Sequence, residues 1–162
     1  MGQHKVWRRW AAVLGLALAG LHGATAAPAP ALVTILEGEA SVLRETQRFA
    51  AAEGLALRAD DIVVTGSAAR LVRIELDDGR TIDLGPGTQL MLLPRALTRD
   101  GAPAGYLLQG WAKLTLPAPG AGASATATLA TPRGDAARIA GTLIASIAAD
   151  RMWLFVESGS AE

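Results

Sequence analysis

The segment LRADDIVVTGSAARLVRIELDDGRTIDLGPGTQL, residues 57–90, decides the fold because short alternating runs are separated by chemically marked turns. In residues 71–76 (LVRIEL) and 81–84 (TIDL), apolar and polar side chains alternate with the period of two that is typical of strands. The Asp78-Gly79 pair lies between the two runs. This arrangement predicts a β-hairpin, because Gly79 can adopt the positive φ that a tight turn requires.

Similar patterns continue on both sides of this hairpin. They predict further strands over residues 33–42, 89–93, 106–116, 128–131, 137–147 and 152–156. Leu90 and Leu92 are expected to face inward, and Pro94 should end their strand because proline lacks the ladder N–H. Residues 99–101 (RDG) predict a further turn, and the alanine-rich residues 47–54 predict a short helix.

The longest predicted strand covers residues 106–116. Strict alternation would place one set of side chains inward (Leu108, Ala112, Leu114 and Leu116) and the other set outward (Leu107, Trp111 and Lys113). Gly110 falls in the inward set, so it is expected to admit a second backbone at close range or to mark a bulge.

These patterns predict an all-β fold: a single domain of short antiparallel strands and hairpins, arranged as a β-sandwich or in a β-solenoid-like way. The domain is expected to cover residues 31–162. Within it, residues 117–126 (PAPGAGASAT) carry neither a charge nor a large apolar side chain. A mobile surface loop is expected there, because nothing in it offsets the entropy of ordering the chain.

The order of these motifs resembles the FecR domain, a periplasmic module of iron-uptake signalling regulators and of stand-alone envelope proteins. The matching positions, in chain order, are Gly38, Asp61, Ile62, Thr65, Gly66, Asp78, Gly79, Arg80, Ile82, Leu84, Leu107, Gly110, Thr131, Pro132, Gly141 and Thr142. We interpret the following residues as structural turns: Gly38, Thr65, Gly66, Asp78, Gly79, Gly85, Gly141 and Thr142. The resemblance covers residues 31–162 and implies a periplasmic location.

The first 26 residues have the charged, apolar and small-residue parts of a secretory signal peptide. Lys5, Arg8 and Arg9 precede an apolar run over residues 10–21, and Ala24-Thr25-Ala26 follows. That run is shorter than the roughly 20 residues that span a bilayer. We therefore expect cleavage, a short linker over residues 27–30, no membrane span afterwards, and a periplasmic or secreted protein. An uncleaved N-terminal anchor is the alternative.

Removal of this segment would change the available chemistry. His4 and His22 both lie in it, and the chain has no cysteine. Ser-His-Asp and Cys-His catalysis would then lack a general base, and zinc or copper sites would lack their usual ligands. We expect no catalytic residues, no cofactor and no metal in the remaining 136 residues, which suit a single domain.

The numbers of basic and acidic residues limit the classes of binding partner. Without Lys5, Arg8 and Arg9 the chain keeps 12 basic and 15 acidic residues, with no basic tract, so nucleic-acid binding is not expected. A solvated sheet face is expected to carry Arg70, Arg73 and Arg80, paired across strands with Glu75 or Asp83.

Two carboxylate pairs, Asp60-Asp61 and Asp77-Asp78, have the residue type that glycosidases use. Adjacent strand residues face opposite ways, however, and both pairs precede turns in which Asp accepts backbone hydrogen bonds. A structural role is therefore predicted. The spacing around Asp83 misses the calcium-loop pattern, and residues 85–88 (GPGT) lack the lysine and helix of a phosphate cradle.

Aromatic residues are the remaining candidates for contact with a ligand or partner: Trp111, Trp153 and Tyr106. Core or half-buried packing is expected for both tryptophans, because Trp buries a large area.

Two functions fit. The first is a non-catalytic periplasmic interaction module that binds an envelope protein in signalling or envelope assembly, through exposed edges such as residues 106–116 and 128–131. The alternative is a secreted polysaccharide-binding or carboxylate-based glycan-acting domain. It would need a pocket that unites Trp111, Trp153 and two carboxylates. The oligomeric state is left open by the sequence.

Overall fold

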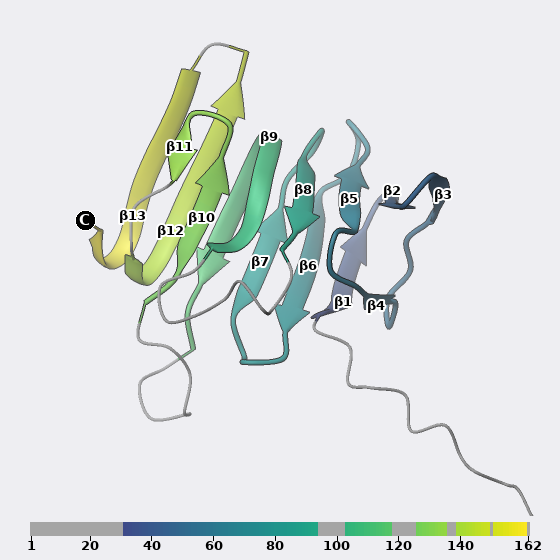
Figure 1. Cartoon of the computed structure of the whole chain (residues 1–162), viewed down its shortest axis with the longest axis horizontal. Helices are drawn as coiled ribbons and strands as arrows, with labels where there is room; N and C mark the ends of the chain where they lie inside the picture. Colours follow the sequence, from purple (N-terminus) through teal and green to yellow (C-terminus); the bar gives the residue numbers. More distant parts are fainter. Residues whose placement is uncertain (1–30, 94–102, 118–125, 136–138, 150, 162) are drawn as a thin grey trace, which may run out of the picture.

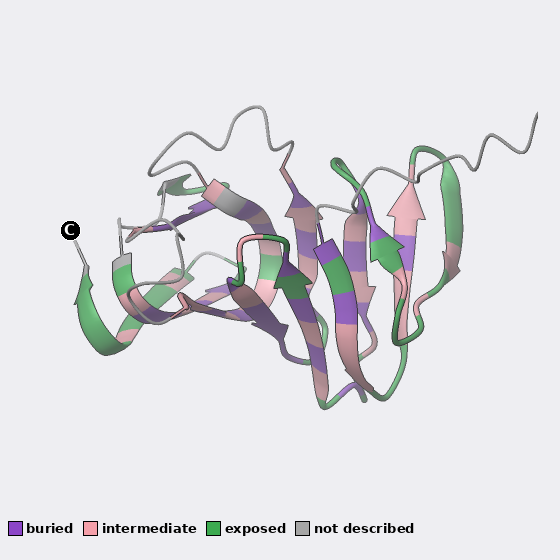
Figure 2. Cartoon of the chain, turned by 90° about the horizontal axis from the view of Figure 1, so that it is seen from below, coloured by how far each residue is buried: buried purple, intermediate pink, exposed green. Residues whose placement is uncertain are grey.

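The computed structural model describes residues 31–93, 103–117, 126–135, 139–149 and 151–161 (Figure 1). Within these residues the chain forms strands and turns and no helix, so the predicted all-β fold is confirmed. The strands make one curled, mainly antiparallel sheet, whose curl is visible from below in Figure 2. No described segment is a helix that is long and apolar enough to cross a membrane.

Thirteen strands are described. The first eight are short and closely spaced: β1 (Ala31–Glu37), β2 (Ala40–Arg44), β3 (Gln47–Ala50), β4 (Ala56–Leu57), β5 (Ile62–Thr65), β6 (Leu71–Leu76), β7 (Thr81–Leu84) and β8 (Gln89–Leu92). The later strands are β9 (Pro103–Thr115), β10 (Thr128–Thr131), β11 (Gly134–Asp135), β12 (Ile139–Ala148) and β13 (Arg151–Ala161).

Strand β9 organises the sheet because its two ends pair with different strands. Its first part is antiparallel to β8 and parallel to β10, and its second part is antiparallel to β7 and β12. The strands joined to its first part, which we call the first half-sheet, are β2, β3, β5, β8, β10 and β11. The strands joined to its second part, the second half-sheet, are β1, β4, β6, β7, β12 and β13.

The change of partners along β9 takes place at a bulge. The register with β8 passes from Leu107 to Gln109 and leaves Leu108 as an extra residue. Gly110 follows with a φ of 87°, and a Cβ there would lie 2.6 Å from the Cα of Thr88. The close backbone approach expected at Gly110 is therefore confirmed, and the bulge lies two residues earlier, at Leu108.

The bulge also overturns the predicted faces of β9. Leu107 is fully buried and Leu108 only half-buried, whereas strict alternation placed Leu108 inward. Beyond the bulge, Ala112 and Leu114 are buried as predicted. The prediction failed because the extra residue shifts the alternation by one, so that Leu107 before the bulge shares a face with Ala112 and Leu114 after it.

One apolar cluster joins the two half-sheets. The first contributes Val42, Val63 and Leu90, and the second contributes Val33, Ile74, Ile82 and Leu143, all fully buried (purple in Figure 2). Leu90 and Leu92 face this core, as predicted.

Residues 47–54 do not form the predicted helix. Residues 47–50 are strand β3, which pairs with β2 across a two-residue turn where Glu45 has a φ of 55°. Phe49 packs against the core from this strand. Cross-strand pairing and burial of Phe49 thus outweigh the helix propensity of the alanines.

The remaining strand predictions hold with adjusted ends. The stretch 33–42 is divided into β1 and β2 at Gly38, which has a φ of 105°. The last strand runs to Ala161 instead of Val156. Residues 1–30, Pro94, the turn at 99–101 and most of the loop at 117–126 lie outside the described residues.

The hairpin that decided the fold is present. β6 and β7 pair from Val72 opposite Leu84 to Glu75 opposite Thr81, and Gly79 has a φ of 82°. A Cβ at Gly79 would meet only Pro117, at 3.6 Å, which is ordinary contact. The requirement for glycine is therefore conformational and not steric.

Replacement of Gly79 tests whether glycine is required there for its positive φ. Gly79→Val should lower the free energy of unfolding by about 1–3 kcal/mol, because a β-branched residue is strained at positive φ. Gly79→Asn should cost less, because asparagine tolerates this region. Urea unfolding of the three proteins measures the difference. Equal midpoints for the valine and asparagine variants would contradict the conformational explanation.

Candidate functional site

Four large apolar side chains lie on strands β9, β12 and β13 and share the outer face of the second half-sheet, which is the face turned away from the core. The registers align Trp111 with Ser146 and Ser146 with Trp153, and the adjacent row aligns Ile144 with Phe155. Directly opposite residues of neighbouring strands project to the same face. Trp153 is 53% exposed and Phe155 61% exposed, and the other two are half-buried. We call Trp111, Ile144, Trp153 and Phe155 the aromatic band.

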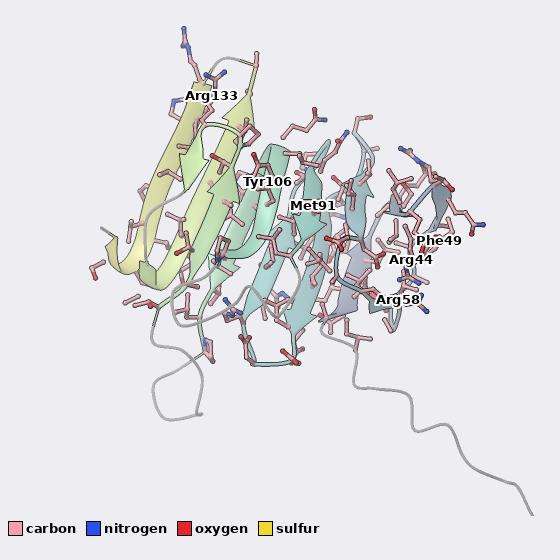
Figure 3. The ribbon with its side chains drawn as sticks, viewed as in Figure 1. Arg44, Phe49, Arg58, Met91, Tyr106 and Arg133 are labelled. Atoms are coloured by element: carbon pink, nitrogen blue, oxygen red, sulfur yellow. The ribbon has the colours of Figure 1, made fainter. Side chains whose placement is uncertain are left out.

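The structure thus brings together two of the three predicted contact residues. Tyr106 lies elsewhere, on the first half-sheet opposite Met91 and Ala130 (Figure 3). The packing prediction holds for Trp111 but is wrong for Trp153. Trp153 is exposed because its strand β13 has, within the described chain, only β12 beside it.

Strand β10 was also predicted as a contact surface, and this prediction is wrong. All four of its residues are buried. Leu129 belongs to the core, and the hydroxyl of Thr131 donates to the carbonyl of Gly134 within the β10–β11 turn. The sequence offered no signal for this, because TLAT alone has the composition of an exposed strand.

A buried threonine positions Trp111. The hydroxyl of Thr88 accepts a hydrogen bond from the Trp111 N–H at 2.9 Å and donates to the Trp111 carbonyl at 3.0 Å. The Thr88 N–H donates in turn to the hydroxyl of Thr65, which donates to the carbonyl of Gly85. Thr88 is fully buried. These bonds satisfy backbone groups that the bulge removes from the regular ladder.

Gly85 supplies the space for the indole ring. A Cβ at this position would lie 2.9 Å from Cε3 of Trp111, so any larger residue would displace the ring. Sequence reasoning marked Gly85 and Thr65 as turn residues but missed Thr88. The available signal was a threonine directly after Gly-Pro-Gly, a position where a hydroxyl can bond the backbone of a turn.

The other predicted turn residues lie at different kinds of position. Gly38 separates β1 from β2, Gly66 follows β5, and Asp78 and Gly79 form the β6–β7 turn. Gly141 and Thr142 lie inside strand β12, opposite Gly159 and Ser158.

Ion pairs flank the aromatic band on the same face. Arg73 makes two bonds to Asp83, at 2.6 and 2.9 Å, and Lys113 contacts Glu157 at 2.5 Å. The hydrogen bonds and charge of Asp83 raise the pKa of Arg73 above its usual value. The expected Arg73–Asp83 pair is therefore confirmed. The outer face changes from charged on β6 and β7 to apolar on β12 and β13.

Arg70 and Arg80 do not form the cross-strand pairs that were predicted for them. Arg70 approaches Glu37 at 3.9 Å on the surface, not Glu75 or Asp83. Arg80 is 8% exposed and bonds Asp78 two residues away, so its predicted place on a solvated face is wrong. Burial raises the pKa of Asp78, but the hydrogen bonds and charge of Arg80 outweigh burial and hold it below its usual value.

The carboxylate of Asp61 is held inside the first half-sheet. Arg44 binds both of its oxygens, at 2.8 and 2.7 Å, and the Arg58 N–H donates a third bond. Figure 3 shows Arg44 and Arg58 close together with Phe49 at this end of the sheet. Asp61 is fully buried, and the guanidinium of Arg44 lies 5.2 Å from the centre of the Phe49 ring. The hydrogen bonds to Asp61 raise the pKa of Arg44. Asp61 accepts a backbone bond as predicted, and in addition it anchors a buried ion pair.

No described part of the chain groups three or more acidic residues as a metal site would require. An open hollow of about 460 Å³ lies beside β3 and is lined by residues of the β1–β3 region, including Glu39, Arg48 and Phe49. It contains neither tryptophan of the aromatic band. Trp111 and Trp153 lie instead on the outer face of the second half-sheet, on strands β9 and β13.

The Arg44–Asp61 pair can be tested by paired substitution. Arg44→Met should lower the free energy of unfolding by about 3–5 kcal/mol, because it leaves the buried Asp61 carboxylate without its cation. Arg44→Met combined with Asp61→Leu should recover most of that loss, because no buried charge remains. Chemical unfolding of the single and double variants measures both. A double variant less stable than the single one would contradict this account.

The role of Thr88 can be tested by removal of its hydroxyl. Thr88→Val should lower the free energy of unfolding by about 1–3 kcal/mol, because it leaves the Trp111 N–H without a partner. Thr34→Val is the matched control, since the buried Thr34 hydroxyl has no hydrogen-bond partner in the described structure. Thermal unfolding should show a clear loss for the first variant and little change for the second. Equal effects would contradict the role of Thr88.

Exposed, rigidly held aromatic side chains are typical of protein-binding surfaces. No protein-family model, curated protein or solved structure matches this chain. The aromatic band is therefore the feature from which a function is inferred.

Proposed function

We propose that this chain is a non-catalytic interaction module of the cell envelope, similar to FecR domains, and that it binds an envelope protein through the aromatic band. The observation that carries the proposal is the exposure of two neighbouring aromatic side chains, Trp153 at 53% and Phe155 at 61%. Such residues are usually buried, and adjacent exposed ones mark interaction sites on soluble domains.

Burial of these side chains would contribute favourably to the binding of a partner. A tryptophan buries about 150–250 Å² in a contact. At about 25 cal/mol per Å², covering the exposed half of Trp153 contributes about 2–3 kcal/mol. The backbone of the band is held by the β9–β12–β13 pairing and by the Thr88 bonds to the Trp111 backbone, so little backbone ordering is needed on binding.

The surroundings of the band also suit a protein contact. The Lys113–Glu157 pair lies beside Phe155 and gives the apolar centre a polar border. Interfaces commonly combine a central aromatic group with a charged rim.

Polysaccharide binding is the second candidate, and one observation favours it. Trp111 and Trp153 project from the same face two strands apart, about 10 Å by the usual strand spacing, and aromatic rings can stack on sugars. Glycan hydrolysis is less favoured. The described carboxylate beside the band, Glu157, is paired with Lys113, and Asp61, Asp78 and Asp83 are each bonded to an arginine.

Site-specific photocrosslinking in living cells tests the proposal. A photoreactive phenylalanine analogue at position 155 should capture a specific envelope protein, because this residue is the most exposed of the band. The same analogue at Arg48, exposed on the distant strand β3, is the control and should capture none. Trp153→Ala should weaken binding of the captured protein about thirtyfold, as expected for an aromatic hot spot of about 2 kcal/mol.

Leu32→Ala is the matched control for that loss, because Leu32 is also an exposed large apolar residue, at 39%, but lies on strand β1. It should bind like the unaltered protein. Absence of any captured protein at position 155 would contradict the proposal. Binding of an envelope polysaccharide that is lost in Trp153→Ala would favour the second candidate instead.

A further inference from the structure

The described sheet ends in strands of very different length. β3 has four residues, and β4 and β11 have two each. β13 has eleven residues and, among the described strands, pairs with β12 alone (Figure 1). Short edge strands are a common protection against unwanted pairing, because they offer few free N–H and C=O groups. The edge of β13 lacks this protection.

The side chains of β13 do not protect its edge either. Residues 152–156 (MWLFV) are all apolar, with neither a charge nor a proline. Trp153, Leu154 and Phe155 are all exposed, on both faces of the strand. An edge of this kind is a template for pairing with another strand.

The sequence of β13 is complementary to itself when reversed. Arg151 precedes the apolar residues 152–156, and Glu157 follows them. An antiparallel pair centred on Leu154 places Arg151 of each chain opposite Glu157 of the other, whose carboxylate also contacts Lys113 of its own chain. Opposite charges at facing positions stabilise a strand pair, and like charges destabilise it.

We propose that the outer edge of β13 pairs antiparallel with the same edge of a second copy of this chain, about a two-fold axis at Leu154. This deepens the proposed function and rests on it, because it makes the C-terminal hairpin the contact region of the module. The interface is isologous, so each chain supplies the same patch, and the assembly closes as a dimer.

This register of the two β13 strands determines which residues face each other across the interface. Leu154 faces Leu154 of the second copy on the axis, Trp153 faces Phe155, and Met152 faces Val156. Aromatic pairs across strands are among the more favourable cross-strand contacts. The pairing is confined to residues 151–157, because Glu157 is the extra residue of a bulge against β12 and Gly159 has a φ of 87°.

The pairing leaves the aromatic band available. It uses the backbone edge of β13, whereas Trp153 and Phe155 project from the outer face. The two second half-sheets become one continuous sheet, and the two bands lie side by side across the axis. A partner protein would then meet a doubled aromatic surface.

A charge-exchange experiment tests both the dimer and its register. The purified protein should sediment at twice the mass of one chain. Leu154→Lys and Leu154→Glu should each be monomeric, because residue 154 faces its own copy and like charges would oppose each other. An equimolar mixture of the two variants should recover a dimer, since lysine then faces glutamate.

Independent support comes from crosslinking, because the chain has no cysteine of its own. Leu154→Cys should give a covalent dimer with a short bismaleimide, and Arg48→Cys on β3 should not. A monomer at all concentrations would overturn the inference, as would a dimer that Leu154→Lys leaves intact. The dimer can fail while the proposed function holds. In that case the photoreactive residue at position 155 still captures a different protein, and this product differs in mass from two joined copies of the chain.

Discussion

The close approach of Gly110 to Thr88 is the contact on which the rest of the structure depends. β9 must belong to both half-sheets, and it can do so only if its side chains change face between Leu107 and Ala112. The bulge at Leu108 makes this change, and it removes backbone groups of Trp111 from regular pairing. Thr88 approaches closely enough to bond them only because position 110 has no Cβ. One glycine and one hydroxyl thus stabilise the point at which β9 passes from one half-sheet to the other.

Side chains also bond unpaired backbone groups at two other places where strand pairing is interrupted. Asp61 precedes β5, accepts the Arg58 N–H, and is neutralised by Arg44 from β2. Asp78 accepts the Arg80 N–H in the β6–β7 turn and is neutralised by the Arg80 side chain. In each case a buried or half-buried carboxylate bonds the backbone, and an arginine balances its charge. These carboxylates are committed to structure, which is why the aromatic band and not an acidic cluster is the candidate site.

Local patterns predicted the hairpins and failed at positions decided by distant contacts. The Asp-Gly turn, the inward Leu90 and Leu92, and the Arg73–Asp83 pair follow from alternation and turn chemistry within a few residues. The helix expected at 47–54 failed because pairing with β2 and burial of Phe49 outweigh propensity. The faces of Leu107 and Leu108, the burial of Thr88 and the exposure of Trp153 depend on which strands lie beside β9 and β13. Alternation within one strand carries no information about its neighbours.

The C-terminal hairpin has a consequence for the order in which the molecule assembles. Its pairs extend from Ala148 opposite Arg151 to Ile139 opposite Ala161, so all of them are close in sequence. Hairpins of this kind form in microseconds, whereas contacts between distant segments, such as β1 with β6, form more slowly. The hairpin can therefore exist before β9 is in place to cover its other edge. During that interval both edges are open to neighbouring chains, and the yield of correctly folded protein should depend on chain concentration and on how fast β9 docks.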